Sequence, residues 1–295
     1  MLESVLLTGA NGTIGGWMAG QFQHLGWRVH EHRGRCDGDL AEPGVAESFF
    51  HDSKPTIVVH CAALASIQTA QANPLQAIRS NIEATRLMVQ SAARSMDRPR
   101  FVFVSTDAVF SQCENNSKLR LFVEDDPISP RGVYAQTKAI AESLVKAELP
   151  HSMVVRGTYL IWKGREGSGF VSELVRAATE GRPFDAYEDY FSTPLHPSTA
   201  AAVIAKLIAH KELGTWHLAS FPPISQYDLA KDILAEIGVD SRFIQRHSLR
   251  EYPRGREYPL SPALSGAKLS SRFDHTLPIS QEIARFAEEI QGGGV

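Results

Sequence analysis

The most constraining feature of the sequence is a glycine-rich turn that directly follows a short apolar run near the N-terminus. Residues 4–8 form the apolar run, residues 8–16 read TGANGTIGG, and a helical pattern extends over residues 12–25. Glycines let a backbone approach a pyrophosphate closely, and the helix offers free amide groups and the positive end of its dipole. Because it joins a strand to a helix, the turn predicts a dinucleotide-binding loop; a plain glycine-rich turn is the alternative. The residues expected to contact the dinucleotide there are Gly9, Asn11, Gly12, Thr13, Ile14 and Gly15.

The rest of the first half alternates short, strand-like apolar runs with longer amphipathic stretches. We expect strands over residues 28–32, 56–61, 100–105 and 152–156, and helices over residues 43–51, 74–95 and 134–147. Strands and helices that alternate at this spacing form right-handed βαβ units and a parallel sheet. The sequence therefore predicts an α/β protein with a Rossmann-type, doubly wound parallel sheet.

The alternation loosens after residue 157. We expect helices over residues 169–179, 198–211, 225–237 and 280–290, and one strand over residues 214–219 that can rejoin the sheet. Open α/β sheets bind ligands beyond the carboxyl ends of their strands, so a smaller C-terminal substrate lobe is expected there. The predicted division is a dinucleotide-binding Rossmann domain over residues 1–157 and a mainly substrate-binding lobe over residues 158–295, with a return to the sheet near residues 184–219.

The end of the second expected strand bears on the choice between NAD(H) and NADP(H). A carboxylate at this position binds the ribose 2′-hydroxyl of NAD, whereas a cation accommodates a 2′-phosphate. The strand ends at His32 and Arg33, Arg35 lies two residues further, and no carboxylate stands just beyond the strand. We therefore expect Arg33 to contact the cofactor and NADP(H) to be preferred over NAD(H). The alternatives are that both arginines lie in a solvated turn, or that Glu31 turns inward.

Three further residues form a candidate catalytic set. Tyr134 and Lys138 lie four residues apart and therefore share one face of an expected helix. A neighbouring ammonium favours the phenolate and lowers the pKa of a tyrosine, which suits Tyr134 to proton transfer near neutral pH. Thr106 follows the strand over residues 100–105, where its hydroxyl can donate to the oxygen that Tyr134 protonates. Capping of a turn is the alternative role for Thr106.

Composition narrows the remaining classes. The formal net charge of −3 gives no global attraction for nucleic acid, so an anionic ligand needs a local cluster of donors. Three widely spaced cysteines and 11 dispersed histidines favour neither a disulfide framework nor a metal site. The N-terminal residues do not resemble a signal peptide, and no apolar stretch approaches the ~20 residues that span a bilayer. We expect a cytoplasmic protein with a small-molecule substrate, no nucleic acid, membrane or metal partner, and a homodimer as the candidate assembly.

Segments along nearly the whole chain match the motifs of one known family. They are TGANGTIG at 8–15, GDL at 38–40, HCAAL at 60–64, Asn81, FVSTDAVF at 103–110, PISPRGVYAQTK at 127–138, VVRGTYL at 154–160, STPLHPSTAA at 192–201, GTWHLA at 214–219 and SPALSGAKL at 261–269. In these segments the chain resembles the extended short-chain dehydrogenases/reductases and, among them, the dTDP-4-dehydrorhamnose reductase family.

The resemblance implies a role for each matched residue. Tyr134 would protonate a sugar carbonyl, Lys138 would bind the nicotinamide ribose and tune Tyr134, and Thr106 would orient the carbonyl. Gly9, Gly12 and Gly15 would cradle the pyrophosphate. The further cofactor contacts that we expect are Asp39 and Leu40 beside the adenine, and Cys61, Ala62 and Ala63 along the path of the cofactor.

The substrate-side motifs depart from the family pattern. Tyr159 stands where the family usually has a tryptophan, and residues 192–195 read STPL in place of Gly-Ser-Pro-Thr. Alanines at 200–202 follow where the family has an aspartate shortly after that segment, and His60 replaces an asparagine. The cofactor and catalytic motifs are intact, so the resemblance implies the chemistry more firmly than the substrate.

Three functions agree with these observations. The favoured one is an NAD(P)H-dependent reductase of a keto group on a sugar, in particular a nucleotide-linked one. The second is a sugar-nucleotide epimerase or dehydratase of the same superfamily; a dehydratase usually has an Asp-Glu pair after the threonine, whereas Asp107 and Ala108 follow Thr106. The third is a non-catalytic NADP-binding subunit, since the regulatory subunit of methionine adenosyltransferase resembles this family. The intact catalytic set argues for an enzyme.

Overall fold

Seven parallel strands form the main sheet of the computed structural model, which describes residues 3–112, 119–160, 163–164, 167, 169–251, 259–274 and 276–292. The strand order is β2-β1-β3-β4-β5-β8, and β9 also pairs with β5. The strands are β1 (Ser4–Thr8), β2 (Arg28–His32), β3 (Ile57–His60), β4 (Arg100–Val104), β5 (Met153–Tyr159), β8 (Pro194–Leu195) and β9 (Gly214–Leu218). The expected Rossmann-type parallel sheet is confirmed.

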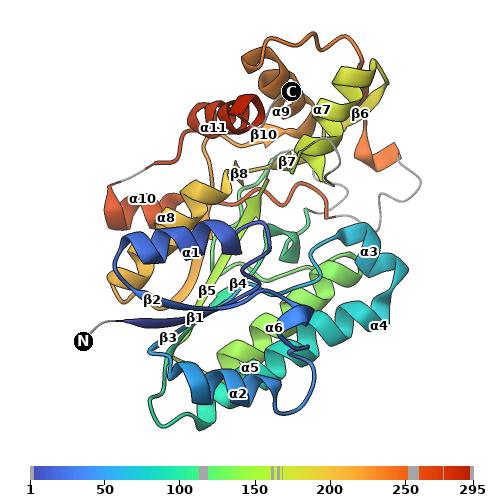
Figure 1. The fold of residues 1–295 in the computed structure, drawn as a ribbon. Coiled ribbons are helices and arrows are strands. Elements are labelled where there is room, and N and C mark those ends of the chain that lie inside the picture. Colours follow the sequence, from blue (N-terminus) through green and yellow to red (C-terminus); the bar gives the residue numbers. More distant parts are fainter. Residues whose placement is uncertain are drawn as a thin grey trace.

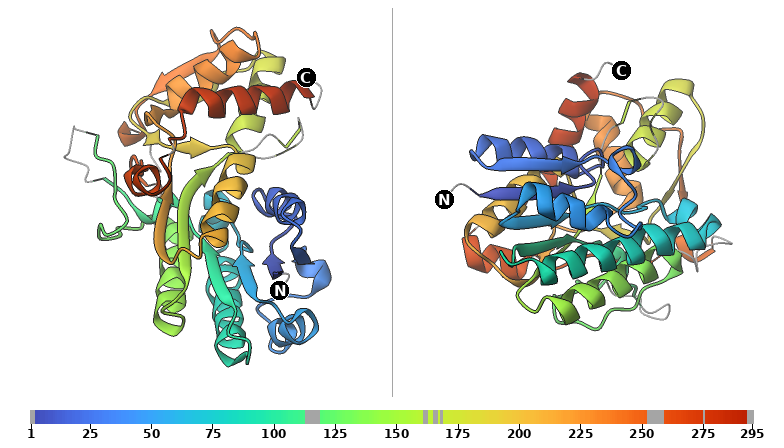
Figure 2. Two further views of the ribbon diagram at one scale, coloured as in Figure 1. Left: turned by 90° about the vertical axis from the view of Figure 1, so that its left-hand side faces the viewer. Right: turned by 60° about the horizontal axis from the view of Figure 1, so that its bottom comes forward.

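Helices cover both faces of the sheet (Figure 1; Figure 2, left). One face carries α1 (Gly15–His24) and α8 (Pro197–Ala209), and the other carries α2 (Val45–Ser53), α5 (Ala84–Arg94) and α6 (Gly132–Glu148). Successive side chains of a strand point to opposite faces, so Val5 and Leu7 of β1 join the core under α1 while Leu6 joins the core under α2 and α5. Because both faces are covered, the strands are continuous apolar runs.

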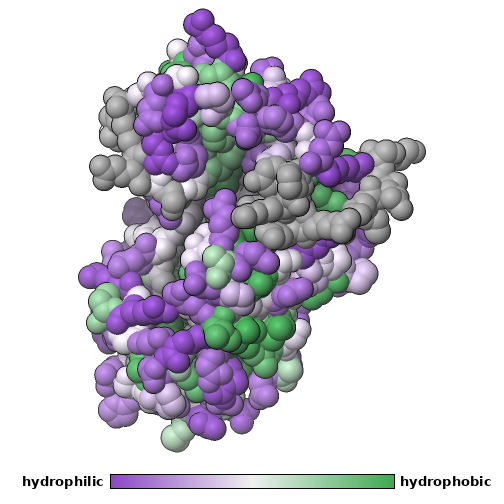
Figure 3. All heavy atoms as spheres, turned by 90° about the vertical axis from the view of Figure 1, so that its right-hand side faces the viewer, coloured by the Kyte–Doolittle hydropathy of each residue, from purple (hydrophilic) through white to green (hydrophobic). Residues whose placement is uncertain are grey.

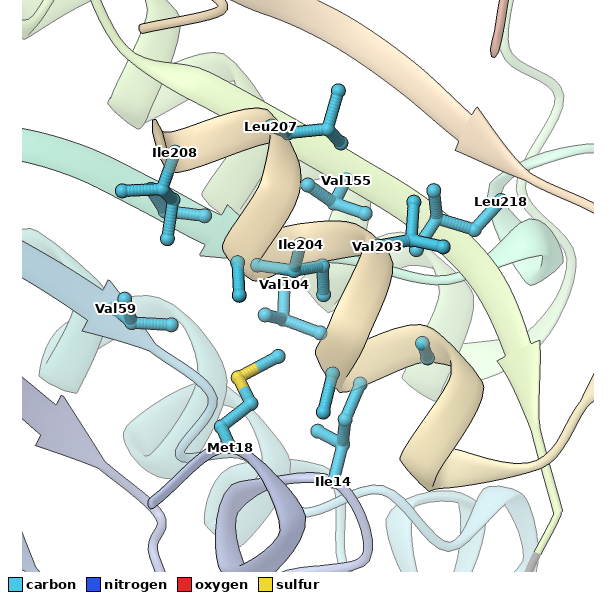
Figure 4. Packing of buried hydrophobic residues seen from close by; sticks show 14 of the residues in the cluster. Ile14, Met18, Val59, Val104, Val155, Val203, Ile204, Leu207, Ile208 and Leu218 are labelled. Carbon is cyan, nitrogen blue, oxygen red and sulfur yellow. The ribbon is translucent and has the colours of Figure 1, made fainter. Parts of the chain in front are cut away.

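The return of the chain to the sheet is explained by the apolar face of α8. Figure 4 shows Ile204 and Val203 of this helix lying over Val104 of β4 and Val155 of β5, with Met18 of α1 beside them. Ile204 and Met18 are fully buried. Burying each such side chain stabilises the fold by about 1.5–3 kcal/mol, which holds α8, and β9 after it, against the N-terminal sheet. The domain division at residue 157 stays a prediction. Two strands that follow it in the chain, β8 and β9, belong to the N-terminal sheet.

The helix expected over residues 74–95 contains a local change of pitch. It consists of α4 (Pro74–Ala77), the π-helical segment η2 (Ile78–Glu83) and α5. A preceding short helix, α3 (Ile67–Ala72), was not expected from the sequence; the Ser66 hydroxyl caps it by accepting from the Thr69 amide at 3.1 Å. π-Helical turns often occur at functional sites, and this one carries Asn81, which is buried.

The second lobe has a core of its own above the carboxyl edge of the sheet (Figure 1). Its helices are α7 (Phe170–Glu180), α9 (Gln226–Glu236) and α11 (Ile279–Gly292). Two small sheets accompany them: β6 (Phe184–Tyr187) pairs in parallel with β11 (Ile244–His247), and β7 (Phe191–Ser192) pairs antiparallel with β10 (Ile224–Ser225). The remaining elements are α10 (Ala267–Phe273) and the 3-10 turns η1 (Arg35–Asp37), η3 (Asp107–Val109) and η4 (Leu249–Glu251).

Candidate active site

The glycine turn is shaped by close approach of backbone to backbone. Gly9 has φ +73°, and a Cβ there would lie 2.7 Å from the Ala62 nitrogen. A Cβ on Gly15 would lie 2.1 Å from the Gly9 oxygen. The Gly12 amide donates to that same oxygen at 2.8 Å. No side chain can occupy Gly9 or Gly15 without moving the turn, so the loop presents bare backbone, as a phosphate cradle requires.

The amino end of α1 opens directly onto this turn. Its N-cap, Ile14, provides no side-chain hydrogen bond, and its first turn contains no acidic residue. The free amides of a helix start attract anions, and an acidic neighbour would compete for them. The residues expected to hold the pyrophosphate therefore fit such a group.

His60, the last residue of β3, lies beside the end of β1, where the glycine turn begins. Its Nδ1 lies 2.7 Å from the Thr8 hydroxyl, and its Nε2 lies 3.1 Å from the Thr85 hydroxyl. Burial lowers the pKa of His60 to about 3, with the Lys138 charge as a smaller cause, so the ring is neutral at physiological pH. His60 thus ties β1 and β3 to α5, and the Ala62 amide lies beside them, donating to Thr8 at 3.3 Å.

The arginines expected at the adenosine ribose are exposed but paired. Arg33 is 60% exposed, and its Nε donates to Glu31 at 2.9 Å. Arg35 lies 3.8 Å from Asp39, and that carboxylate also accepts from Arg79 at 3.2 Å. The sequence analysis missed Arg79, because it lies 40 residues from Asp39. Leu40, expected at the adenine, is buried in the core under α2.

Thr106 and Tyr134 meet at the carboxyl end of β4. Thr106 follows that strand, and its hydroxyl donates to the Asp107 Oδ1 at 3.1 Å. The same hydroxyl lies close enough to Tyr134 to lower the pKa of the phenol. The Ala108 amide donates to the Thr106 oxygen at 3.2 Å, so the turn-capping alternative is also realised. The structure therefore places two members of the candidate catalytic set near each other.

Lys138 lies one helical turn from Tyr134 with its ammonium directed to the end of β4. Its Nζ donates to the Val104 carbonyl at 2.8 Å and lies 4.0 Å from the centroid of the Phe103 ring. Lys138 is 3% exposed. Burial lowers its pKa to about 8, although Glu142 and Cys61 act in the opposite direction.

The expected lowering of the Tyr134 pKa is wrong for this structure. Burial raises the pKa of Tyr134 to about 12. Of the two smaller causes, the neighbouring Thr106 hydroxyl lowers this pKa and the charge of Asp107 raises it. Desolvation disfavours the phenolate, and the Lys138 ammonium is bound to the Val104 carbonyl. Sequence spacing gives the shared helix face but not the direction of a lysine side chain.

A buried ion pair lies next to the candidate catalytic residues along β4 and α6. Arg156 of β5 donates to Glu142 at 2.7 Å, and both side chains are 3% exposed or less. Glu142 also accepts from the Ser105 hydroxyl at 2.5 Å. Because Glu142 follows Lys138 by four residues on α6, the helical spacing that linked Tyr134 to Lys138 was the signal for it.

Asn81 fixes the loop after β3 against α6. Its Oδ1 accepts from the Leu64 amide at 2.7 Å, and its Nδ2 donates to the Thr137 hydroxyl at 2.9 Å. Thr137 immediately precedes Lys138, so the π-helical turn of η2 connects the loop of Ala62 and Ala63 to the catalytic helix.

We call the cluster of side chains around Thr106, Tyr134 and Lys138 the pocket. Two further residues of this cluster, Asp107 and Tyr159, were given no role by the sequence analysis. Asp107 is 5% exposed and accepts hydrogen bonds from the hydroxyls of Thr106 and Thr158. Burial raises the pKa of Asp107 to about 6. Tyr159, noted only as a departure from the family pattern, has a buried hydroxyl without a hydrogen-bond partner in the described part of the chain.

Two negative observations apply to the described residues alone. None of their helices is both long enough and apolar enough to cross a bilayer. No three of their His, Cys, Asp or Glu side chains are arranged so that they could hold a metal ion.

Known proteins resemble this chain over nearly its whole length. The dTDP-4-dehydrorhamnose reductase of Mycobacterium tuberculosis strain H37Rv is 28% identical over 271 residues, which cover 92% of this chain and 86% of that protein. The dTDP-4-dehydrorhamnose reductase structure from Clostridium acetobutylicum has a TM-score of 0.86 at 25% identity and covers 97% of this chain and 99% of its own. The dTDP-4-dehydrorhamnose reductase of Bacillus anthracis, solved in complex with NADP, has a TM-score of 0.86 at 21% identity, with coverages of 98% and 100%.

A family model supports the same conclusion. The model described as the RmlD substrate binding domain matches residues 3–291. That range includes the glycine turn, the catalytic set and most of the second lobe. The resemblance seen in the sequence is confirmed, and the chain belongs to the RmlD substrate-binding-domain family.

Proposed function

We propose that this protein is an NAD(P)H-dependent reductase of a keto group on a nucleotide-linked sugar, and that its substrate class is a dTDP-linked 4-keto-6-deoxyhexose. The observation that carries the proposal is that Thr106, the ammonium of Lys138 and nearby Tyr134 gather at the carboxyl end of β4, the sheet edge that also bears the glycine turn. The names of the relatives suggest the sugar class.

The cofactor would lie along the glycine turn, and its nicotinamide supplies the hydride when it is bound. Gly9, Gly12 and Gly15 leave bare backbone for the pyrophosphate. Cys61, Ala62 and Ala63 follow β3, and the buried ammonium of Lys138 is the cation available for the ribose hydroxyls.

Tyr134 would supply the proton. With a pKa of about 12, its hydroxyl stays protonated at neutral pH. As the carbonyl is reduced, its oxygen becomes an alkoxide, which is a stronger base than a phenolate, so the proton moves from Tyr134 to the substrate. Thr106 would turn its hydroxyl from Asp107 toward the same oxygen, and the positive charge of Lys138 would stabilise the phenolate left behind.

We further propose a preference for NADP(H). Arg33 and Arg35 supply exposed guanidinium groups just after β2, which a 2′-phosphate can engage. The paired carboxylates, Glu31 and Asp39, orient these arginines, and an NAD-type contact would require Glu31 to leave Arg33.

A homodimer in a reducing cytoplasm completes the proposal. Figure 3 shows hydrophobic side chains gathered on the lower half of the face it presents. On the neighbouring segments α4, η2 and α6, the exposed apolar residues are Leu75 (82%), Ile78 (45%) and Ile140 (47%). Sedimentation of Ile78→Glu beside the wild type tests the assembly; an unchanged mass would remove this face as the interface.

The proposed compartment is supported by two cysteines. Cys36 and Cys61 are free thiols, as is usual in a reducing cytoplasm.

The experiment that tests the main proposal follows NADPH absorbance at 340 nm with a dTDP-linked 4-keto-6-deoxyhexose. The wild-type protein should consume NADPH and form the hydroxyl product, detected by mass. Binding of NADPH without consumption, at substrate concentrations that saturate the site, would favour the non-catalytic subunit instead.

A further inference from the structure

A buried polar group near the candidate catalytic set has no role in the proposed mechanism. Tyr159 is the last residue of β5, and its hydroxyl is buried without a hydrogen-bond partner among the residues that the structure describes. Most buried hydroxyls in proteins have a partner, so an unpaired one needs an explanation. At the carboxyl edge of a parallel sheet, where ligands bind, the explanation is a partner that arrives with the substrate.

The surroundings of the hydroxyl identify it as a hydrogen-bond donor. Burial raises the pKa of Tyr159 well above its usual value, and Cys61, Asp107 and Tyr134 raise it further. The Tyr159 hydroxyl therefore keeps its proton and has Asp107 and Tyr134 among its electrostatic neighbours. Asp107 accepts hydrogen bonds from Thr106 and Thr158, but none joins it to Tyr159 among the described residues, so the proton of Tyr159 has no acceptor there.

Gly157 makes this position of the ring possible. A Cβ on Gly157 would lie 2.8 Å from the Tyr159 hydroxyl and 2.9 Å from two carbons of its ring. The tyrosine ring thus folds back over the backbone of its own strand. With any larger residue at position 157 the ring must move, and the hydroxyl with it.

We propose that the Tyr159 hydroxyl binds the oxygen substituent on the carbon next to the substrate carbonyl, and so selects sugars that carry one. The inference rests on the proposed function, because the Tyr134–Thr106 pair defines where the carbonyl oxygen lies. In a 4-keto-6-deoxyhexose, C5 bears the methyl group and the ring oxygen. The C5 oxygen is the ring ether, which is a weaker acceptor than an alcohol, whereas C3 bears a free hydroxyl. The substituent assigned to Tyr159 is the C3 hydroxyl, which accepts its proton.

The test compares two substrates and two variants. The substrates are a dTDP-linked 4-keto-6-deoxyhexose and its 3-deoxy analogue. Tyr159→Phe removes only the hydroxyl, and kcat/KM should fall about tenfold on the hydroxylated sugar, the effect of losing one neutral hydrogen bond, with no change on the 3-deoxy sugar. Gly157→Ala keeps the hydroxyl but displaces the ring, and it should reproduce the same pattern. Titration of NADPH should give the wild-type affinity in both variants.

Thermal unfolding separates this role from a structural one. Removing an unpaired buried hydroxyl relieves a desolvation cost, so Tyr159→Phe should melt at or above the wild-type temperature while its activity falls. A lower melting temperature together with equal losses on both sugars would mean that the hydroxyl has a structural partner, which overturns the proposal.

The remaining outcomes are also decisive. If the wild-type protein reduces the hydroxylated sugar and Tyr159→Phe reduces it equally well, the inference fails while the proposed function stands. If Tyr159→Phe weakens NADPH instead, the hydroxyl faces the cofactor and the inference fails. If the wild-type protein reduces neither sugar, the proposed function fails and this inference fails with it.

Discussion

The glycine turn and the catalytic pocket lie at the same edge of the sheet but are built in different ways. The turn is made of backbone: its amides, its positive φ at Gly9 and the contact between Gly9 and Gly15 leave no place for a side chain. The pocket is made of titratable side chains, among them Asp107, Tyr134 and Lys138, whose pKa values are all shifted mainly by desolvation.

The difference teaches what each region is sensitive to. A backbone cradle tolerates changes of pH but no added atom, because its geometry depends on van der Waals contact. A pocket of buried acids and bases tolerates conservative changes of shape, but its charges respond to every proton and every neighbouring charge. Substitutions that change one property at a time should therefore separate the two regions.

The largest effect is expected in the turn. Gly15→Ala puts a Cβ 2.1 Å from the Gly9 oxygen, so the loop must open, and NADPH binding should disappear in a calorimetric titration. The matched control is Gly20→Ala on the same helix, where no atom lies within 4 Å of the added Cβ. Equal cofactor affinity in the two variants would contradict the backbone-cradle account.

The next effect belongs to the pocket. Tyr134→Phe keeps the ring and deletes the proton donor, so the reduction rate should fall ~10²-fold or more, the usual scale for a lost general acid. Cofactor affinity should hardly change, because the glycine turn is untouched. Tyr227→Phe, in α9 of the second lobe, is the control and should retain full activity. A Tyr134→Phe enzyme with normal turnover would remove Tyr134 from the mechanism.

A third prediction uses pH. The pKa of Lys138 is about 8 in the folded protein and about 10.4 in an unfolded chain. Between these values the unfolded chain binds more protons, so stability rises with pH; below about 8 the full cost of roughly 3 kcal/mol is present. Lys138→Met should therefore raise the free energy of unfolding at pH 7, by up to about that amount, while weakening NADPH binding.

Urea unfolding of Lys138→Met and wild type at pH 7 and pH 10 measures this difference. The advantage of the variant should shrink at the higher pH, since wild-type Lys138 is then neutral in the folded state. A variant that is less stable than wild type at pH 7 would show that the bond to the Val104 carbonyl outweighs the cost of burial.

The smallest effect is expected at the solvent-exposed ribose end. Arg33→Ala should weaken NADPH binding several-fold and leave NADH binding unchanged, because an exposed charge pair contributes about 1 kcal/mol or less. Arg28→Ala, an exposed arginine at the other end of β2, is the control. Equal weakening of both cofactors by Arg33→Ala would argue against a 2′-phosphate contact.

The sheet was predictable from sequence because its signals are local. β1 and β2 have the expected bounds, and the glycine turn lies between β1 and α1 as its spacing indicated. The end of the fifth strand was predicted less accurately, at residue 156. β5 continues through Gly157 to Tyr159, because it pairs with β9 and β8 on residues that sequence periodicity does not connect.

The pocket was predictable in its members but not in its electrostatics. Spacing put Tyr134 and Lys138 on one helix face, and position after a strand indicated Thr106. His60 and Asp107 depend on burial and on hydrogen-bond partners from other elements, and Tyr159 on burial without a partner; no local pattern encodes either. The sign of the Tyr134 pKa shift was missed for the same reason: burial is a property of the folded molecule.

Transfer of hydride from cofactor to sugar carbon is the central claim, and isotopic labelling tests it most directly. NADPH carrying deuterium at both C4 positions of the nicotinamide, so that either face delivers the label, is incubated with the protein and a dTDP-linked 4-keto-6-deoxyhexose, and the product is examined by NMR. The account predicts one deuterium at C4 of the sugar for each NADPH consumed, and none in Tyr134→Phe on the time scale of the wild-type reaction. An altered sugar without deuterium and without NADPH consumption would contradict it, and would instead indicate an epimerase or dehydratase that returns hydride to its own substrate.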